Sequence, residues 1–313
     1  MNQTVAEVMG GLGNQMFIYA FARAQQLAYG GRCVLVDRQD GPVAHAVCAL
    51  QLLCISPEVE ICRDADYMKT ALPLPNALRS LALRCETKRG GMMSRDWSGF
   101  ERRICPILNR FGVHFATEGY LACRRSTQSL LAWGYFQGEE YFVPYTETIR
   151  RELRPRPENI PQNEFAAALA EANRAGRTVC VHARRGDYLK PENAALQVCT
   201  PDYYRRALAA AAAALPGATF VFFSDDPDWV RENLQVPGQK TLYAPAGGTA
   251  VGDLALMQQC SDFIMSNSTY SWWAQYLGSA PQKQVFAPCR WYAGGKQTAL
   301  YQPFWHLIET NPE

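Results

Sequence analysis

The chain has 313 residues, 48% of them hydrophobic and 19% charged, which is the composition of a folded globular protein with room for two domains. Its 31 basic and 29 acidic residues leave a formal net charge of +2, which argues against a nucleic-acid partner, since phosphate-binding surfaces concentrate basic charge. The eleven cysteines are odd in number and form no Cys-x-x-Cys pair. They therefore indicate reduced thiols in a cytoplasmic protein rather than a zinc or redox motif.

The N-terminal residues contain neither a basic cluster nor a long apolar stretch, so we expect no secretory signal peptide. No stretch reaches the ~18 consecutive apolar residues that a membrane-spanning helix needs. The alanine-rich run 207–215 is a strong helix former and is too short for that role.

The N-terminal region has the pattern of a β-α-β unit. A strand is expected over 4–9, a helix over 16–29 and a second strand over 32–36, with the glycine-rich turn Gly10-Gly-Leu-Gly-Asn-Gln15 between the first two. Such a turn can present backbone amides to an anion, but it lacks G-x-G-x-x-G and the Walker lysine, which argues against a nicotinamide oxidoreductase. The alternative is a tight connection in which Asn14 caps the helix.

Two features of the middle region help to place the domains. Asp64-Ala-Asp66 has the D-x-D form of some metal-dependent sugar transferases, but no apolar strand precedes it, so a solvated loop is expected. The segment 129–142 is rich in aromatic residues, most of which we assign to core packing. The proline-rich stretch 151–161 cannot continue a helix or a central strand. It divides the chain into domains 1–150 and 151–313.

The second half alternates strands and helices, which predicts a parallel sheet wrapped by helices, a Rossmann-like α/β domain. Helices are expected at 164–175, from Pro201 behind a Thr200 cap, after Ser224-Asp-Asp-Pro, at 251–260, and from Ser266 to near Gly278. The expected strands are 178–181, 218–223, 240–243, 262–265 and 284–286.

Polar residues follow three of these strands and should meet at one edge of the sheet, where open α/β sheets bind ligands. Arg184 and Arg185 come directly after the first strand. Because neighbouring charges at a strand end need anionic partners, they predict either a phosphate site or an internal salt bridge to Asp187.

The other two polar segments suit the remaining parts of a nucleotide. The hydroxyls and amides of Ser266 to Thr269 can bind phosphate, and the carboxylates of Asp225 and Asp226 can accept from guanine. Asp226-Pro-Asp228 could instead bind a metal, but a capping role with Pro227 at the first helical position explains these residues better.

Together these motifs resemble the bacterial α-1,2-fucosyltransferases of glycosyltransferase family 11, over nearly the whole chain. The residues that carry the resemblance are Gly10-Gly-Leu-Gly-Asn-Gln-Met-Phe17, Gly134-Tyr-Phe-Gln-Gly-Glu139, His182-Ala-Arg-Arg-Gly-Asp-Tyr188, Phe223-Ser-Asp-Asp226 and Ser266-Asn-Ser-Thr-Tyr-Ser-Trp-Trp273. Gly138 stands where the family pattern more usually has serine.

The resemblance implies a GT-B-like fold, with two Rossmann-like domains facing across a cleft. It also implies inverting transfer of L-fucose from GDP-β-L-fucose to the 2-hydroxyl of a β-galactoside, with no metal and no other cofactor. The first domain would take the acceptor and the second the donor. The partners implied are GDP-fucose and a galactose-terminated oligosaccharide or lipid-linked glycan, the latter at the inner face of the membrane.

Residue roles follow from the same resemblance. Arg184 would grip the β-phosphate and Arg185 would support the pocket, and the remaining donor contacts would come from His182, Asp225 or Asp226, Ser268 and Thr269. Asn14 and Gln15 would lie near the reacting centre. The general base stays open between Asp187 and Glu139, and Asp187 could instead be ion-paired to Arg185. The rival functions are an α-1,6- or O-fucosyltransferase and a GDP-sugar-binding protein without transfer activity.

Overall fold

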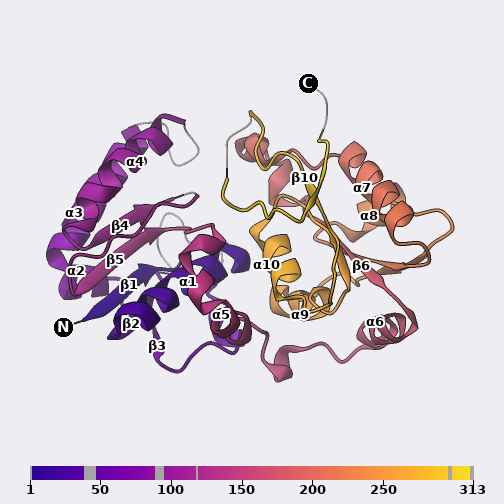
Figure 1. Ribbon diagram of the computed structural model, residues 1–313, viewed down its shortest axis with the longest axis horizontal. Coiled ribbons are helices and arrows are strands. Elements are labelled where there is room, and N and C mark those ends of the chain that lie inside the picture. The colour runs from indigo at the N-terminus through magenta and orange to yellow at the C-terminus, as the bar shows by residue number, and fades with distance from the viewer. Residues whose placement is uncertain (1, 39–46, 89–94, 118, 295–297, 311–313) are drawn as a thin grey trace. The chain divides into compact units, whose positions relative to one another are not determined.

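The structure is a computed structural model that describes residues 2–38, 47–88, 95–117, 119–294 and 298–310, with only the backbone at 95–98. The chain divides into two compact units, one of Met1–Leu153 with Thr298–Leu300 and the other of Arg154–Gln297 with Tyr301–Glu313. Each unit has a parallel sheet with helices on both faces (Figure 1). None of the helices described is long and apolar enough to cross a membrane.

The first unit has a five-stranded sheet in the order β3-β2-β1-β5-β4. Its strands are β1 (Gln3–Glu7), β2 (Arg32–Val36), β3 (Val59–Cys62), β4 (Val113–Ala116) and β5 (Ser129–Gly134). Its α-helices are α1 (Leu12–Tyr29), α2 (Tyr67–Ala71), α3 (Pro73–Lys88), α4 (Arg95–Asn109) and α5 (Thr146–Glu152). Short 3-10 turns are η1 (Leu50–Leu52), η2 (Glu139–Tyr141) and η3 (Val143–Tyr145).

The second unit has a six-stranded sheet in the order β11-β10-β9-β6-β7-β8. Its strands are β6 (Thr178–Ala183), β7 (Thr219–Ser224), β8 (Lys240–Tyr243), β9 (Asp262–Ile264), β10 (Val285–Pro288) and β11 (His306–Ile308). Its α-helices are α6 (Glu164–Ala175), α7 (Pro201–Ala214), α8 (Pro227–Asn233), α9 (Ala250–Met257) and α10 (Thr269–Leu277). Its 3-10 turns are η4 (Pro157–Asn159), η5 (Asp187–Leu189) and η6 (Pro191–Leu196).

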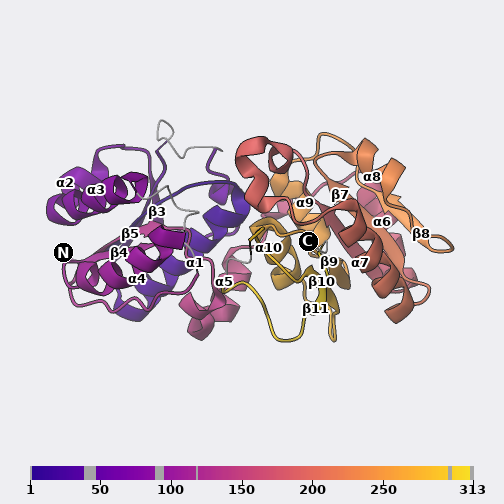
Figure 2. The same cartoon turned by 90° about the horizontal axis from the view of Figure 1, so that it is seen from above.

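Alternation along the strands separates two cores in the first unit. Val5, Val34 and Leu131 face one side and pack with residues of α2. His114 of β4 faces the other side, where its ring stacks on Phe21 of α1 at 5.3 Å. Figure 2 shows α2 and α3 on one side of this sheet and α1 and α4 on the other.

The second unit follows the same plan around β6. Val179, Val181 and Ala183 point to a core that they share with residues of α7 and α8. The alternate residue His182 faces α10, where its ring lies 5.4 Å from that of Tyr270. The carboxyl end of β6 is thus held from both faces by packed helices, which fixes where the chain leaves the sheet.

Most of the expected elements are present. The strand 32–36 and the helix 164–175 have the expected bounds, and α7 begins with Pro201 behind the Thr200 cap. The expected α/β class with two Rossmann-like sheets is confirmed. The strands β3, β4, β5 and β11 were not expected, because short segments with weak alternation lack a clear period.

Asn14 does not cap α1, so that interpretation of the turn is wrong. The helix begins at Leu12, its N-cap is Gly11, and no side chain caps it. Gly10 has φ +71, a backbone conformation that side chains disfavour, and a Cβ there would lie 2.7 Å from the Asn14 amide nitrogen. The helix therefore begins four residues before the expected Met16, which places Asn14 inside the first helical turn.

A buried ionic cluster attaches α5 to α1 in the first unit. The Glu152 carboxylate accepts from the Tyr19 hydroxyl at 2.6 Å and pairs with the Arg23 guanidinium at 3.1 Å. Burial and the hydrogen bond to Glu152 raise the pKa of Tyr19 far above its usual value. The same hydroxyl accepts from the Ser56 amide at 2.9 Å, so one carboxylate holds three chain segments together.

We expect Glu152→Ala to lower the free energy of unfolding by about 3–5 kcal/mol, because it leaves the buried Arg23 charge without its buried partner. Glu58→Ala is the matched control: this carboxylate also pairs with Arg23 but is largely exposed, so its loss should cost less than about 1 kcal/mol. Urea unfolding of both variants measures the difference. Equal losses would contradict the role of Glu152.

His114 is a buried neutral base in the core beneath α4. Burial lowers its pKa to about 3, and its Nδ1 lies 3.1 Å from the Asn109 side-chain amide and 3.4 Å from the Cys105 sulfur. The unfolded chain therefore binds a proton on this ring below about pH 6.5, where the folded protein does not. The contribution of His114 to stability is full above that pH and is lost as the pH falls toward 3.

Between pH 6.5 and 5, the protonation of His114 in the unfolded chain should lower the free energy of unfolding by about 2 kcal/mol. His114→Asn should remove this loss, although it lowers stability at pH 7. Urea unfolding at several pH values compares the slopes for the two proteins. His182, whose pKa is also lowered to about 3, contributes equally to both slopes, so their difference isolates His114. Parallel slopes would show that the ring is protonated in the folded protein.

Candidate functional site

The register of the second sheet brings the three predicted segments together. Ala183, the last residue of β6, pairs with Ser224, the last residue of β7, and Val181 pairs with Ile264, the last residue of β9. Because all three strands are parallel and adjacent, the chain leaves each of them at the same edge. Arg184 and Asp225 are thus the next residues on neighbouring strands.

Arg184 lies between two carboxylates at this edge. Its guanidinium pairs with Asp187 at 2.5 Å and with Asp225 at 2.9 Å, and its side chain remains 36% exposed. Both carboxylates also contact water, since the Asp187 side chain is 47% exposed and that of Asp225 25%. A charge that is held by partly solvated carboxylates can exchange them for another anion at low cost.

Arg185 has a different environment from its neighbour. Its Nε donates to Asp226 at 2.9 Å, and its guanidinium carbon lies over the Trp229 ring, 3.7 Å from the centroid. The expected pair between Asp187 and Arg185 is wrong, because the turn η5 brings Asp187 back to Arg184 at an i,i+3 spacing. Stacking and a carboxylate together give Arg185 a supporting position in the wall of the site.

Asp225 links the two arginines. One carboxylate oxygen accepts from the Arg185 backbone amide at 2.8 Å, and the other pairs with Arg184. Gly186 makes this approach possible, because a Cβ there would lie 2.7 Å from the Asp225 carboxylate. A side chain at position 186 would therefore displace the Asp225 carboxylate.

His182 is buried beneath the arginines and is held by hydroxyls. Its Nδ1 lies 2.5 Å from the Ser271 hydroxyl and 3.1 Å from that of Ser266, which in turn lie 3.0 Å apart. Burial, and secondarily the Arg184 charge, lowers the pKa of His182 to about 3. The imidazole is therefore neutral at physiological pH, and one of its nitrogens is occupied within the protein.

The third segment forms the start of α10. Ser268 is the N-cap, and its hydroxyl accepts from the Tyr270 amide at 3.3 Å, while Thr269 is the first helical residue. The Asn267 side chain donates to the carbonyls of Leu196 and Trp291 at 2.9 and 2.8 Å, which fastens two loops to this edge. Amides at a helix start beside an arginine form an anion-binding arrangement.

The residues predicted near the reacting centre lie in the first unit. The Asn14 side-chain oxygen accepts from Gln137 at 3.0 Å. Gln15 is buried, and its amide joins the Gly10 carbonyl at 2.9 Å to the Ala49 backbone amide at 2.9 Å. These backbone contacts account for Gln15 structurally, and its contact with a substrate stays a prediction. Glu139 is half-buried at the start of η2.

The acidic pairs of the sequence have structural roles. Asp64 and Asp66 lie in an exposed loop, as expected, where Asp64 accepts from the Asp66 backbone amide at 2.9 Å. The expectation that no strand precedes this loop is wrong, because β3 ends at Cys62. Asp226 caps α8, and Pro227 occupies its first position. Among the described residues, no group of three or more His, Cys, Asp or Glu side chains is placed to hold a metal ion. Metal independence itself stays a prediction.

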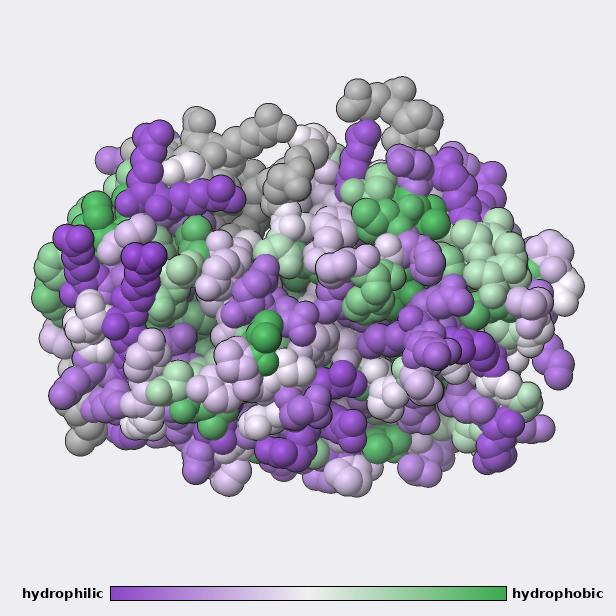
Figure 3. Space-filling view, in the orientation of Figure 1, coloured by the Kyte–Doolittle hydropathy of each residue, from purple (hydrophilic) through white to green (hydrophobic). Residues whose placement is uncertain are grey.

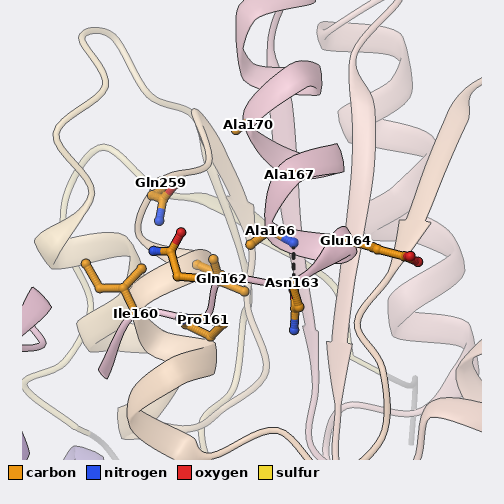
Figure 4. Close-up of a pocket in the computed structure, with 10 residues that line it drawn as sticks. Ile160, Pro161, Gln162, Asn163, Glu164, Ala166, Ala167, Ala170 and Gln259 are labelled. Carbon is orange, nitrogen blue, oxygen red and sulfur yellow. Dashed lines mark hydrogen bonds between the residues drawn. The ribbon is translucent and has the colours of Figure 1, made fainter. Parts of the chain in front are cut away.

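An open pocket of about 760 Å³ lies elsewhere in the second unit, between the start of α6 and the end of α9. Figure 4 shows Gln162 and Gln259 on one side of it, with Asn163 capping α6 through the Ala166 amide. None of the predicted site residues lines this pocket. The carboxyl edge of the sheet therefore remains the candidate site.

Sequence reasoning missed three residues of this edge. Trp229 stacks on Arg185, Asn267 fastens the loops, and Tyr188 donates to the Asn267 carbonyl at 3.1 Å. Tyr188 and Asn267 lie inside the motifs that were recognised, so the motifs pointed to them without giving their contacts. The sequence feature that could have indicated Trp229 is its position three residues after the Asp226 cap.

Comparison with known proteins identifies the group to which this architecture belongs. The sequence model described as "Glycosyl transferase family 11" matches residues 107–309, more than half of the chain. The α-1,2-colitosyltransferase of Escherichia coli is 25% identical over 303 residues, which cover 93% of both chains. A galactoside 2-α-L-fucosyltransferase of Caenorhabditis elegans is 29% identical over 182 residues, 55% of this chain and 49% of that protein.

The fold has a counterpart among solved structures. The fucosyltransferase NodZ from Bradyrhizobium matches with a TM-score of 0.53 and 16% identity, covering 90% of this chain and 94% of that one. This likeness confirms the GT-B-like α/β fold that the motifs implied. With the family match over its central and C-terminal parts, the chain belongs to glycosyl transferase family 11.

Proposed function

We infer that this protein is an inverting α-1,2-fucosyltransferase, which moves L-fucose from GDP-β-L-fucose to the 2-hydroxyl of a β-galactoside. The observation that carries the proposal is Arg184, whose ionic partners are two partly solvated carboxylates at the strand edge where this fold binds ligands. Family membership supports glycosyl transfer, and the α-1,2 linkage is common to the names of the two relatives described above.

Donor binding requires a change of partners at Arg184. The two arginines and the carboxylates of Asp187, Asp225 and Asp226 carry a net charge of about −1, which by itself does not attract a diphosphate. The donor phosphate must therefore replace a carboxylate on Arg184, and Asp187 is the more exposed of its two partners. Ser268 and Thr269 add hydroxyls and helix-start amides to the same phosphate.

The other residues of the candidate site either contact the nucleotide or support the wall of the site. An oxygen of Asp225 or Asp226 accepts a second hydrogen bond, from guanine, through its remaining lone pair, and neutral His182 offers its second ring nitrogen to the guanosine. Arg185 stays on Trp229 and keeps the wall rigid. Bond cleavage places negative charge on the departing phosphate oxygen, and a preorganised Arg184 offsets that charge.

The acceptor hydroxyl needs a base, and two carboxylates remain candidates for it. Asp187 becomes free to accept a proton once the donor phosphate takes its place on Arg184. Glu139 lies in the first unit, in the region assigned to the acceptor, together with Asn14, which would orient the hydroxyl. Loss of transfer with donor affinity retained distinguishes the base from a donor-binding residue.

Transfer of colitose is the second candidate, because a colitosyltransferase matches over 93% of both chains. Colitose is fucose without the 3-hydroxyl. A site that hydrogen-bonds this hydroxyl rejects the deoxy sugar by about 10⁴–10⁵, whereas an apolar site hardly distinguishes the two. The proposed acceptor is a galactose-terminated or lipid-linked glycan, modified in the cytoplasm.

Incubation with GDP-fucose and a panel of β-galactosides should give an α-1,2-fucosylated product at the same rate with and without EDTA. Determination of the linkage by NMR identifies donor and reaction together. GDP-colitose in the same assay tests the second candidate. Activity that EDTA abolishes and manganese restores would indicate that Asp64 and Asp66, or Asp226 and Asp228, bind a metal ion. Transfer to a hydroxyl of the acceptor other than the 2-hydroxyl would contradict the proposed α-1,2 linkage.

Arg184→Ala should reduce kcat for transfer by about 10²–10³, because one preorganised donor to the leaving group is lost, while thermal stability changes little. Arg205→Ala is the matched control, since Arg205 pairs with Asp202 on the exposed side of α7 in the same unit. Transfer kinetics, GDP affinity and thermal unfolding are measured for both variants. Unfolding of the Arg184 variant with unchanged GDP affinity would contradict the assignment.

A further inference from the structure

Helix α4 of the first unit buries one face firmly and exposes the other. On the inner face, the Glu101 carboxylate accepts from the Thr117 amide at 2.6 Å, and Cys105 lies 3.4 Å from His114. On the outer face, Ile107 is 58% exposed, and Phe111, in the turn that follows the helix, is 51% exposed. Single apolar side chains are often exposed, so Ile107 and Phe111 indicate a partner only together with the charges around them.

The outer face also carries unpaired basic charge. Arg102, Arg103 and Arg110 are exposed. Arg103 and Arg110 lie on the same side as Ile107, since positions 103, 107 and 110 follow helical spacing, with Arg110 just past the end of α4. None of these arginines forms an ion pair among the residues that the structure describes. The sequence from Arg102 to Thr117 contains no acidic residue.

Arg124 extends this basic face beyond the helix. Its neighbour Ser126 donates to the Asn109 carbonyl at 3.0 Å, and the Asn109 side chain contacts the Ala122 carbonyl, so this segment passes the end of α4. Figure 3 shows long hydrophilic side chains beside hydrophobic ones over the region where Figure 1 places α3 and α4. We call Arg102, Arg103, Arg110, Arg124, Ile107 and Phe111 the α4 face.

We propose that the α4 face binds the surface of an anionic lipid bilayer. Arginines flanking exposed Ile and Phe side chains have the chemistry of interfacial helices, in which guanidinium groups meet lipid phosphates while apolar side chains enter the acyl boundary. A nucleic acid would use the charges but leave Ile107 and Phe111 without a role. The excess of basic over acidic charge on this face excludes a basic partner.

The inference does not depend on which sugar is transferred, because no residue of the α4 face belongs to the candidate site. The inference concerns where the enzyme is located, not which reaction it catalyses. A lipid-linked acceptor diffuses in the plane of the bilayer, so an enzyme bound to the bilayer surface encounters it by diffusion in two dimensions. Transfer to a soluble oligosaccharide should therefore be the same with and without the α4 face.

Flotation of the full chain with phosphatidylcholine vesicles, with and without about 30% phosphatidylglycerol, tests the proposal. We expect binding to the anionic vesicles only, weakened by added salt. Arg103→Gln/Arg110→Gln should lower the partition coefficient about thirtyfold, since each arginine contributes about a factor of five near an anionic surface. The matched control is Arg174→Gln/Lys240→Gln, which removes two exposed charges of the second unit.

The apolar part of the face has its own test. Ile107→Ser/Phe111→Ser should also release the protein from anionic vesicles, whereas Leu74→Ser/Leu81→Ser on α3, at similar exposure, should not. Transfer to lactose serves as the folding control for every variant. Four outcomes would overturn the proposal: no binding to anionic vesicles, equal binding to neutral ones, equal effects of test and control variants, or binding to heparin but not to vesicles.

Discussion

The contact on which the candidate site depends is the bridge that Asp225 makes between two adjacent arginines at the end of β6. One oxygen holds the Arg184 guanidinium and the other the Arg185 amide, so a single carboxylate fixes both the side chain and the turn. The bridge exists because the register pairs Ala183 with Ser224, and because Gly186 leaves room for the carboxylate. Two like charges can stay adjacent there only because each also has its own acidic partner.

This arrangement gives the two arginines different tasks although they are neighbours in sequence. Arg185 is fixed by Asp226 and the Trp229 ring and cannot reach a ligand without losing both contacts. Arg184 is paired twice but remains partly solvated, so a phosphate can compete for it. In the proposed reaction, discrimination between fucose and colitose depends on other residues, since the sugars differ by one hydroxyl that a contact to the phosphate does not sense.

The α4 face follows from the topology of the first unit. The chain crosses from β3 at one edge of the sheet to β4 at the other, and α4 ends beside β4 with Cys105 and Asn109 turned toward His114. Because these inner contacts fix the rotation of the helix, its arginines and Ile107 point outward. The proposed donor site at the second sheet and the proposed attachment through the first unit thus involve separate surfaces of one chain.

The sequence by itself determined the α/β class, the Rossmann-like second half and the three polar segments that share one sheet edge, because strand alternation, caps and prolines act over a few residues. Motif order was sufficient to indicate family 11. Only the tertiary structure decided that Asp187 pairs with Arg184, that Trp229 supports Arg185, that Asn14 lies inside α1 rather than capping it, and that α4 turns its arginines outward. These depend on register, turn geometry and helix rotation, which are set by packing between residues far apart in the chain.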